Sequence, residues 1–194
     1  MKVFICYGFR AINLLLFNVC LMAIETPEYR LLEKNGMLEL RQYKSIVIAV
    51  TKVQQPYKSA QSEGFRRIAS YIFGGNENET EIAMTAPVIS TKVNTIIEEH
   101  EVFFIIPRNL NIEDLPKPNL KNVKIEKRNL SKVAAIKFGG WATEERVLYF
   151  QDILKNKILE LGYSITGDFM VAQYNSPWAL PPFRKNEILV QIKS

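Results

Sequence analysis

Few residues in this chain have the side chains that catalysis or metal binding most often uses. The 194 residues include one histidine, His100, which lies in the acidic run formed by residues 98–101. A Ser-His-Asp arrangement would have to use that histidine, and carboxylates beside an imidazole could bind a metal ion. A stretch of mixed charge before an apolar strand is more often a solvated loop. We therefore expect His100 to be exposed, and we predict neither a metal site nor an enzyme.

Cysteine, glycine and charge usage argue against three further chemistries. Both cysteines, Cys6 and Cys20, fall within the first 20 residues, so the rest of the chain has no disulfide, thiolate metal site or cysteine nucleophile. Gly139-Gly140 is followed by Trp141 and lacks the spacing of a phosphate-binding loop. The net charge is +5, but the basic residues are interleaved with acids. The sequence therefore does not support nucleic-acid binding.

The first 23 residues have the composition of a targeting segment. Lys2 and Arg10 give a positive start, and residues 11–23 form an apolar run that is short for a membrane span. We expect residues 1–23 to be a signal peptide or an N-terminal membrane-targeting segment, followed by one domain over residues 24–194. Cleavage would export the domain to the periplasm or outside the cell. Without cleavage it would be membrane-associated through this segment, or cytoplasmic.

Hydrophobic periodicity predicts two helices that would position any site. Phe65, Ile68 and Ile72 share one face of a helix over residues 59–73, which ends at Gly74-Gly75. A second helix over about residues 143–161 ends before Gly162. Its apolar face is formed by Val147, Phe150, Leu154, Ile158 and Leu161.

Apolar and alternating segments predict strands around both helices, in the order strand, strand, helix, strand, strand, twice. The first two strands of each half are expected to form a hairpin. Residues 45–50 and 132–137 are similar and lie 87 positions apart, which suggests an internal duplication. Each half would leave one face of its sheet bare, and the two halves would cover each other. The predicted strands are 37–43, 46–53, 82–88 and 102–107 in the first half and 123–129, 132–138, 169–174 and 188–192 in the second.

Six short motifs occur in an order that resembles the SOUL family of haem-binding proteins, over about residues 25–193. The resemblance implies an α+β fold in which duplicated ββαββ units, about residues 37–107 and 123–193, form a distorted antiparallel β-barrel flanked by two helices. We expect a monomer. The motifs are Glu39-Leu40-Arg41-Gln42-Tyr43, Tyr71-Ile72 with Asn76, Met84-Thr85-Ala86-Pro87-Val88, Phe103-Phe104-Ile105-Ile106-Pro107, Phe138-Gly139-Gly140-Trp141-Ala142, and Tyr174-Asn175-Ser176-Pro177 followed by Arg184-Lys185-Asn186-Glu187.

The resemblance also implies a ligand and a place for it. Haem or a related tetrapyrrole would bind non-covalently in a surface hydrophobic cleft, between the first helix and the proline-rich loop before the last strand. The small Ala69 and Ser70 would let a flat ring approach closely, and arginines could pair with its propionates. The candidate residues are Phe65, Arg66, Ala69 and Ser70 of the helix and Tyr174, Trp178, Leu180 and Arg184 of the loop.

An axial ligand for haem iron is not evident in the sequence. Proteins hold haem iron through His, Cys, Met or Tyr, and some SOUL members have a histidine where this chain has Gln42. We therefore expect binding without histidine ligation. Tyr71, Met84 and Tyr174 could ligate, but we interpret them as core or edge side chains. The alternative is a non-haem small-molecule or protein-interaction module of the gyrase-inhibitor-like fold.

Overall fold

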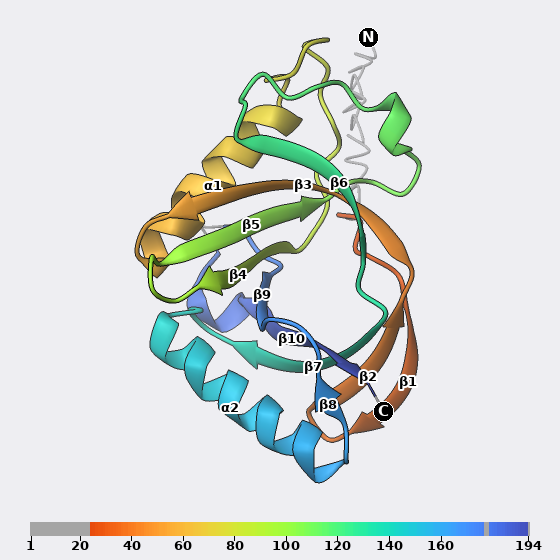
Figure 1. Ribbon diagram of the computed structural model, residues 1–194, viewed down its shortest axis with the longest axis vertical. Helices are drawn as coiled ribbons and strands as arrows, with labels where there is room; N and C mark the ends of the chain where they lie inside the picture. The colour runs from red at the N-terminus through yellow and green to blue at the C-terminus, as the bar shows by residue number, and fades with distance from the viewer. Residues whose placement is uncertain (1–23, 177–178, 194) are drawn as a thin grey trace, which may run out of the picture.

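The computed structural model describes residues 24–176 and 179–193 (Figure 1). The expected leader and Trp178 therefore lie outside the described residues. Within the described part, no helix has both the length and the apolar character that crossing a membrane requires. The elements, in chain order, are β1 (Tyr29–Asn35), β2 (Leu38–Tyr43), β3 (Ser45–Gln54), α1 (Tyr57–Ile72), β4 (Val88–Asn94), β5 (Glu99–Ile105), η1 (Ile112–Asp114), β6 (Val123–Asn129), β7 (Lys132–Gly139), α2 (Glu144–Glu160), β8 (Ser164–Ile165), β9 (Met170–Gln173), η2 (Pro181–Phe183) and β10 (Lys185–Lys193).

The strands form one ten-stranded antiparallel sheet that curves around an interior, with the helices packed outside it (Figure 1). The order is β1-β2-β7-β10-β9-β4-β5-β3-β6, with β8 paired to β10. Helix α1 packs on β5 and β3, and α2 packs on β7, β8 and β10. The predicted α+β class and both helices are confirmed. The sheet is not closed, because β1 and β6 remain its two edges.

The two halves are interlocked in the sheet. Next to the edge strand β1, the order inward is β2, β7, β10 and β9. From the opposite edge the order inward is β6, β3, β5 and β4, the corresponding elements of the other half. The expected hairpins are wrong, because β2 pairs with β7 and β3 pairs with β6. Lys44 alone separates β2 from β3, which is too short for a two-residue hairpin turn. Each half therefore completes the sheet of the other.

Three local predictions differ from the structure. The strand expected over residues 82–88 begins only at Val88, and Met84 is exposed rather than alternating into a sheet. Ile82 is buried, and its N–H donates to the carbonyl of Ile72 at the end of α1. Strand β1 was not among the predicted strands, because all seven of its residues are exposed and it carries no hydrophobic pattern. The two-residue strand β8 was also not predicted.

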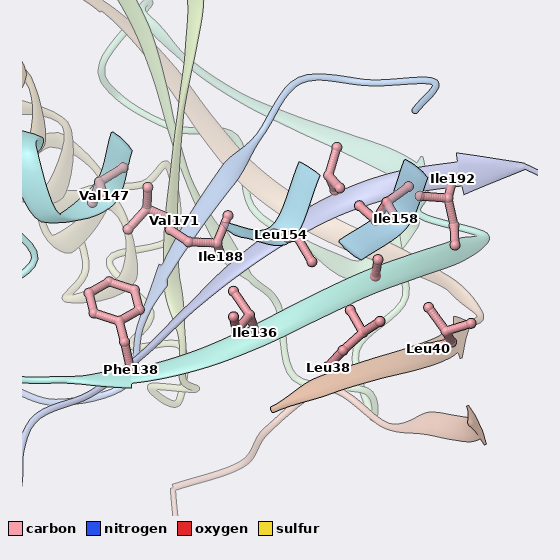
Figure 2. Packing of buried hydrophobic residues seen from close by; sticks show 12 residues of the cluster. Leu38, Leu40, Ile136, Phe138, Val147, Leu154, Ile158, Val171, Ile188 and Ile192 are labelled. Carbon is pink, nitrogen blue, oxygen red and sulfur yellow. The ribbon is translucent and has the colours of Figure 1, made fainter. Parts of the chain in front are cut away.

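Apolar side chains fill both sides of the curved sheet. Figure 2 shows the cluster between α2 and the sheet, where Leu154 and Ile158 of α2 meet Ile136 of β7 and Ile188 of β10. A second cluster fills the interior, and a third lies under α1, around Ile68. The sheet is thus held from both faces, and the surface near the start of α1 is left to form a cleft.

Candidate functional site

A cleft of about 920 Å³ opens beside the first half of α1. This volume is within the roughly 300–1,000 Å³ that is typical of small-molecule sites. The floor comes from β4, β5 and β9, and the opposite wall comes from the segment between β7 and α2. The lining residues are Pro56, Tyr57, Lys58, Gln61, Ser62, Phe65, Val88, Ser90, Val102, Trp141, Ala142, Thr143, Glu144, Gln173, Asn175 and Arg184.

Gly64 allows α1 to lie directly on the floor of the cleft. A Cβ at this position would be 2.5 Å from Cγ2 of Val102, which is closer than carbon atoms can approach. Gly64 belongs to the buried stripe of α1, together with Ala60 and Ile68. Phe65 is the next residue, so its half-buried ring turns from this stripe toward the cleft.

Three aromatic side chains, Tyr57, Phe65 and Trp141, give the cleft its apolar surface. The Tyr57 hydroxyl donates to the carbonyl oxygen of Ala142 at 3.2 Å, which ties α1 to the opposite wall. Burial raises the pKa of Tyr57 to about 12, so the hydroxyl stays protonated at neutral pH. Trp141 is half-exposed, and its ring is available at the mouth of the cleft.

Arg184 places a positive charge at the rim. Its guanidinium carbon lies 3.7 Å from the ring centroid of Trp141, a cation–π contact. Its Nε donates to the carbonyl oxygen of Ala179 at 2.8 Å. The residue is buried, with 7% of its surface exposed. The guanidinium is therefore held in one place beside an aromatic wall, where it can attract an anionic group.

The cleft floor carries a short chain of polar groups. Nε2 of Gln173 donates to Oε1 of Gln61 at 2.8 Å, and Nε2 of Gln61 donates to Oγ of Ser90 at 3.4 Å. These residues come from β9, α1 and β4, so the chain links three elements. It leaves the Ser90 hydroxyl hydrogen free to donate elsewhere.

The structure brings two of the eight candidate residues, Phe65 and Arg184, to the cleft. Arg66 is exposed and pairs with Glu63. Ala69 and Ser70 lie further along α1 and do not line the cleft. Leu180 is exposed and also lies outside the lining, and Trp178 is not among the described residues. The part of α1 that lines the cleft therefore extends from Tyr57 to Phe65.

Sequence reasoning missed Tyr57 and Gln61, although a signal was present. With Phe65 they occupy positions i, i+4 and i+8 of α1, which is one helix face. That face lies beside the buried stripe, so it borders the core without entering it. Trp141 belongs to a motif of the resemblance but was not named as a candidate.

Tyr174 lies in a buried ion cluster of the interior instead of the cleft. Its hydroxyl donates to Oε2 of Glu187 at 2.7 Å. The same carboxylate accepts from Arg41, which also bonds Glu39 and the hydroxyl of Tyr43. Burial and the neighbouring Glu187 raise the pKa of Tyr174, so the hydroxyl remains a neutral donor.

The other ligation candidates also lie away from the cleft lining. Tyr71 is buried and donates to the carbonyl of Pro116 at 3.0 Å. Met84 is exposed, and Gln42 lies on β2 with its amide donating to the carbonyl of Tyr43. In the described residues, no group of three or more His, Cys, Asp or Glu side chains is arranged to hold a metal ion.

The expectation that His100 is exposed is wrong. His100 lies in β5 and is only 2% exposed. Side chains alternate along a strand, so His100 shares a face with Val102 and Phe104, which are buried beneath α1. The acidic residues around it in the sequence suggested a loop, because charge dominated the local pattern.

Comparison with known proteins gives a consistent result. The family model described as SOUL heme-binding protein matches residues 24–191. Heme-binding protein 2 of Homo sapiens is 31% identical over 183 residues, which cover 86% of this chain and 85% of that protein. Heme-binding protein 1 of Xenopus laevis is 28% identical over 180 residues, covering 88% and 94%. A solved hydrolase structure from Listeria innocua aligns with a TM-score of 0.59 at 10% identity, covering 84% and 94%. At that identity the likeness shows the fold alone.

Proposed function

Because the chain belongs to the SOUL heme-binding protein family, we propose that it binds haem or a related tetrapyrrole non-covalently in the cleft beside α1. The observation that carries this proposal is the combination of three aromatic side chains with the buried guanidinium of Arg184 at the rim. A tetrapyrrole is a flat apolar ring with carboxylate substituents, so it needs such a surface and such a charge. The residues present fit that ligand.

Five of the lining residues have roles that follow from their chemistry. The faces of Tyr57, Phe65 and Trp141 would pack against the macrocycle, since aromatic rings contribute large apolar contact areas. Arg184 and the exposed Lys58 would pair with the propionates. Arg184 is already held by Trp141 and Ala179, so little side-chain freedom would be lost on binding. Haem, when bound, supplies the redox and ligand chemistry of its own iron.

We propose that binding does not depend on an axial ligand from the protein. Among the described residues, Tyr57 is the only one in the lining whose side chain belongs to the usual ligand types, His, Cys, Met and Tyr. Its hydroxyl bonds Ala142, and its raised pKa makes the ligating tyrosinate costly. The ring and its carboxylates would then provide the affinity. The proposal includes no catalytic step.

The expected affinity is micromolar. Burial of roughly 600 Å² of apolar surface, ring and protein together, contributes about 15 kcal/mol at ~25 cal/mol/Å². Association and ordering of side chains cost at least about 4 kcal/mol and offset much of that gain. A net of about −8 kcal/mol corresponds to a micromolar Kd.

Titration with hemin and with iron-free protoporphyrin IX tests the proposal. The Soret band and the porphyrin fluorescence report binding of each ring. We expect Kd values that agree within about threefold, because the iron is not the point of attachment. Absence of binding by either ring below about 100 µM, roughly −5.5 kcal/mol, would overturn it. Hemin binding about a hundredfold tighter than the iron-free ring would overturn the absence of axial ligation.

The alternative is a non-haem small-molecule or protein-interaction module of the gyrase-inhibitor-like fold. The likeness to the Listeria innocua structure supports its fold and no particular ligand. The titration with hemin and protoporphyrin IX distinguishes the two functions, because a non-haem module is not expected to bind either porphyrin ring.

We also propose that residues 1–23 direct export, on the basis of their positive start and apolar run. N-terminal sequencing of the protein produced in cells tests this. The expected product begins near residue 24 or is membrane-held, and a soluble cytoplasmic product that begins at Met1 would contradict it.

A further inference from the structure

A smaller cavity of about 60 Å³ lies directly behind the cleft. The two spaces share three lining residues, Tyr57, Ser90 and Glu144, so they adjoin at these side chains. The small cavity is also lined by His100, by Lys92 and, from α2 and the sheet, by apolar residues such as Val171.

His100 is the one histidine in the sequence, and its hydrogen bonding is incomplete. Within the described residues, its Nε2 is buried and has no hydrogen-bond partner. The nearest aromatic ring contact is edge-on to Tyr57, with centroids 6.0 Å apart. Buried polar atoms nearly always have a partner, because an unsatisfied one loses its bond to water without replacement. The free nitrogen therefore indicates a missing partner.

The chemistry of the walls defines that partner. Burial, together with the nearby charge of Lys92, lowers the pKa of His100, so the imidazole is neutral at pH 7 and one nitrogen offers a lone pair. The Glu144 carboxylate adds further acceptors, whereas the Ser90 oxygen already accepts from Gln61. The Lys92 ammonium is 4.0 Å from Glu144 and is paired with it. A hydrogen-bond donor thus fits this cavity better than an acceptor.

The size of the cavity limits the partner to a small group. A water molecule occupies about 30 Å³ in the liquid, so 60 Å³ accommodates a hydroxyl group with one or two carbon atoms. A whole ring system would not enter. The cavity therefore suits a substituent on the edge of a larger molecule that fills the cleft.

We propose that the small cavity is a subsite of the cleft, which takes a short hydroxyl-bearing substituent of the bound ring, with the hydroxyl donating to Nε2 of His100. This inference rests on the proposed function. It adds a preference among tetrapyrroles: rings with a hydroxyalkyl edge bind better than rings with only apolar edge groups.

Two porphyrins test this preference. Haematoporphyrin IX differs from protoporphyrin IX in having 1-hydroxyethyl groups in place of vinyl groups. The Kd of each is measured for the unsubstituted protein, for His100→Phe and for His100→Gln. The ratio of the two Kd values is compared between protein variants, because the difference in hydration between the two free rings is the same for every variant and cancels. We expect the ratio of the protoporphyrin Kd to the haematoporphyrin Kd to be about two- to tenfold higher for the unsubstituted protein than for His100→Phe, the effect of one hydrogen bond.

His100→Gln retains an acceptor and should keep part of the preference, and it serves alone if His100→Phe does not fold. Equal ratios in the unsubstituted protein and the folded variants would overturn the subsite.

A second measurement tests the subsite independently of the proposed function. Because the chain has a single histidine, its imidazole ¹⁵N signals identify His100 without further assignment. Methanol and acetonitrile are similar in size, but only methanol donates a hydrogen bond. We expect a saturating shift with methanol and only a small linear drift with acetonitrile. If neither porphyrin binds, the proposed function fails, and a saturating methanol response still supports the subsite. Equal responses to the two solvents would reject the subsite.

Discussion

Arg41 and Glu187 form a two-point ion pair in the interior, with Nη2 to Oε1 at 2.7 Å and Nη1 to Oε2 at 2.8 Å. The residues are 146 positions apart, on β2 and β10, and Arg41 is fully buried. Glu39, Tyr43 and Tyr174 belong to the same cluster. These five residues belong to the first and last motifs of the resemblance. The motifs therefore include residues that hold the halves together, as well as residues near the cleft.

Replacement of Arg41 by Met should strongly destabilise the fold. It would leave the buried carboxylate of Glu187 without its arginine partner and Glu39 with Lys137 alone of the two, and breaking a buried pair in this way costs about 3–5 kcal/mol. Urea unfolding gives the change. Arg30→Met is the matched control, because Arg30 lies on the exposed strand β1, and it should cost no more than about 0.5 kcal/mol. Equal stability of the two variants would contradict a structural role for Arg41.

Tyr174→Phe tests whether Tyr174 stabilises the interior or contributes to ligand binding. Loss of the hydroxyl removes the 2.7 Å hydrogen bond to Glu187, so we expect a destabilisation of about 1.5–3 kcal/mol, typical of a bond to a charged group. The Kd for protoporphyrin IX should change less than twofold, since Tyr174 does not line the cleft. Weaker porphyrin binding with unchanged stability would contradict this and show that Tyr174 contributes to the ligand site, as the sequence predicted.

Acid should weaken the fold through Glu39. Burial alone would raise the pKa of this carboxyl, but hydrogen bonds from Lys137 and Arg41 outweigh it and lower the pKa from 4.5 to about 2. A lowered folded-state pKa contributes stability above the unfolded value, and this contribution is lost as the pH falls from 4.5 toward 2. Melting temperatures between about pH 5 and pH 2.5 should fall more steeply for the unsubstituted protein than for Glu39→Gln. Parallel curves would show that Glu39 does not take part.

Gly64→Ala should disturb the contact between α1 and β5. Alanine favours a helix by about 1 kcal/mol relative to glycine, but the new Cβ would be 2.5 Å from Val102. Relief of this overlap must move the helix, at a typical cost of 1–3 kcal/mol. We expect a net loss of stability and weaker porphyrin binding, because Val102 forms part of the cleft floor. A more stable variant would show that α1 is not held close to the sheet.

The sequence predicted the elements whose residues alternate between core and solvent. Both helices were located because Ile68 and Leu154 lie on periodic apolar faces that are buried. Strand β1 was missed because none of its residues is buried. The pairing of β2 with β7 could not be predicted from the local sequence of β2, since its partner strand lies in the other half of the chain.

The site was predicted less well than the fold. Phe65 and Arg184 were found through the resemblance, whereas Tyr57 required the face of α1 to be known. The burial of His100 depends on which face of β5 lies under α1, and the acidic residues beside it concealed that face. Both the position of Tyr57 in the cleft and the burial of His100 depend on how segments far apart in the sequence pack together.

The most direct test of the proposed function is a matched pair of substitutions on α1 and its end. Phe65 lines the cleft, whereas Phe73 is exposed at the C-terminal end of α1 and lies outside the lining. Phe65→Glu removes an apolar contact and places a carboxylate against an anionic ligand, and Phe73→Glu adds the same charge elsewhere. Protoporphyrin IX titration should give at least a tenfold weaker Kd for Phe65→Glu, about 1.4 kcal/mol, and a change of less than twofold for Phe73→Glu. Equal affinities of the two folded variants would contradict tetrapyrrole binding in this cleft.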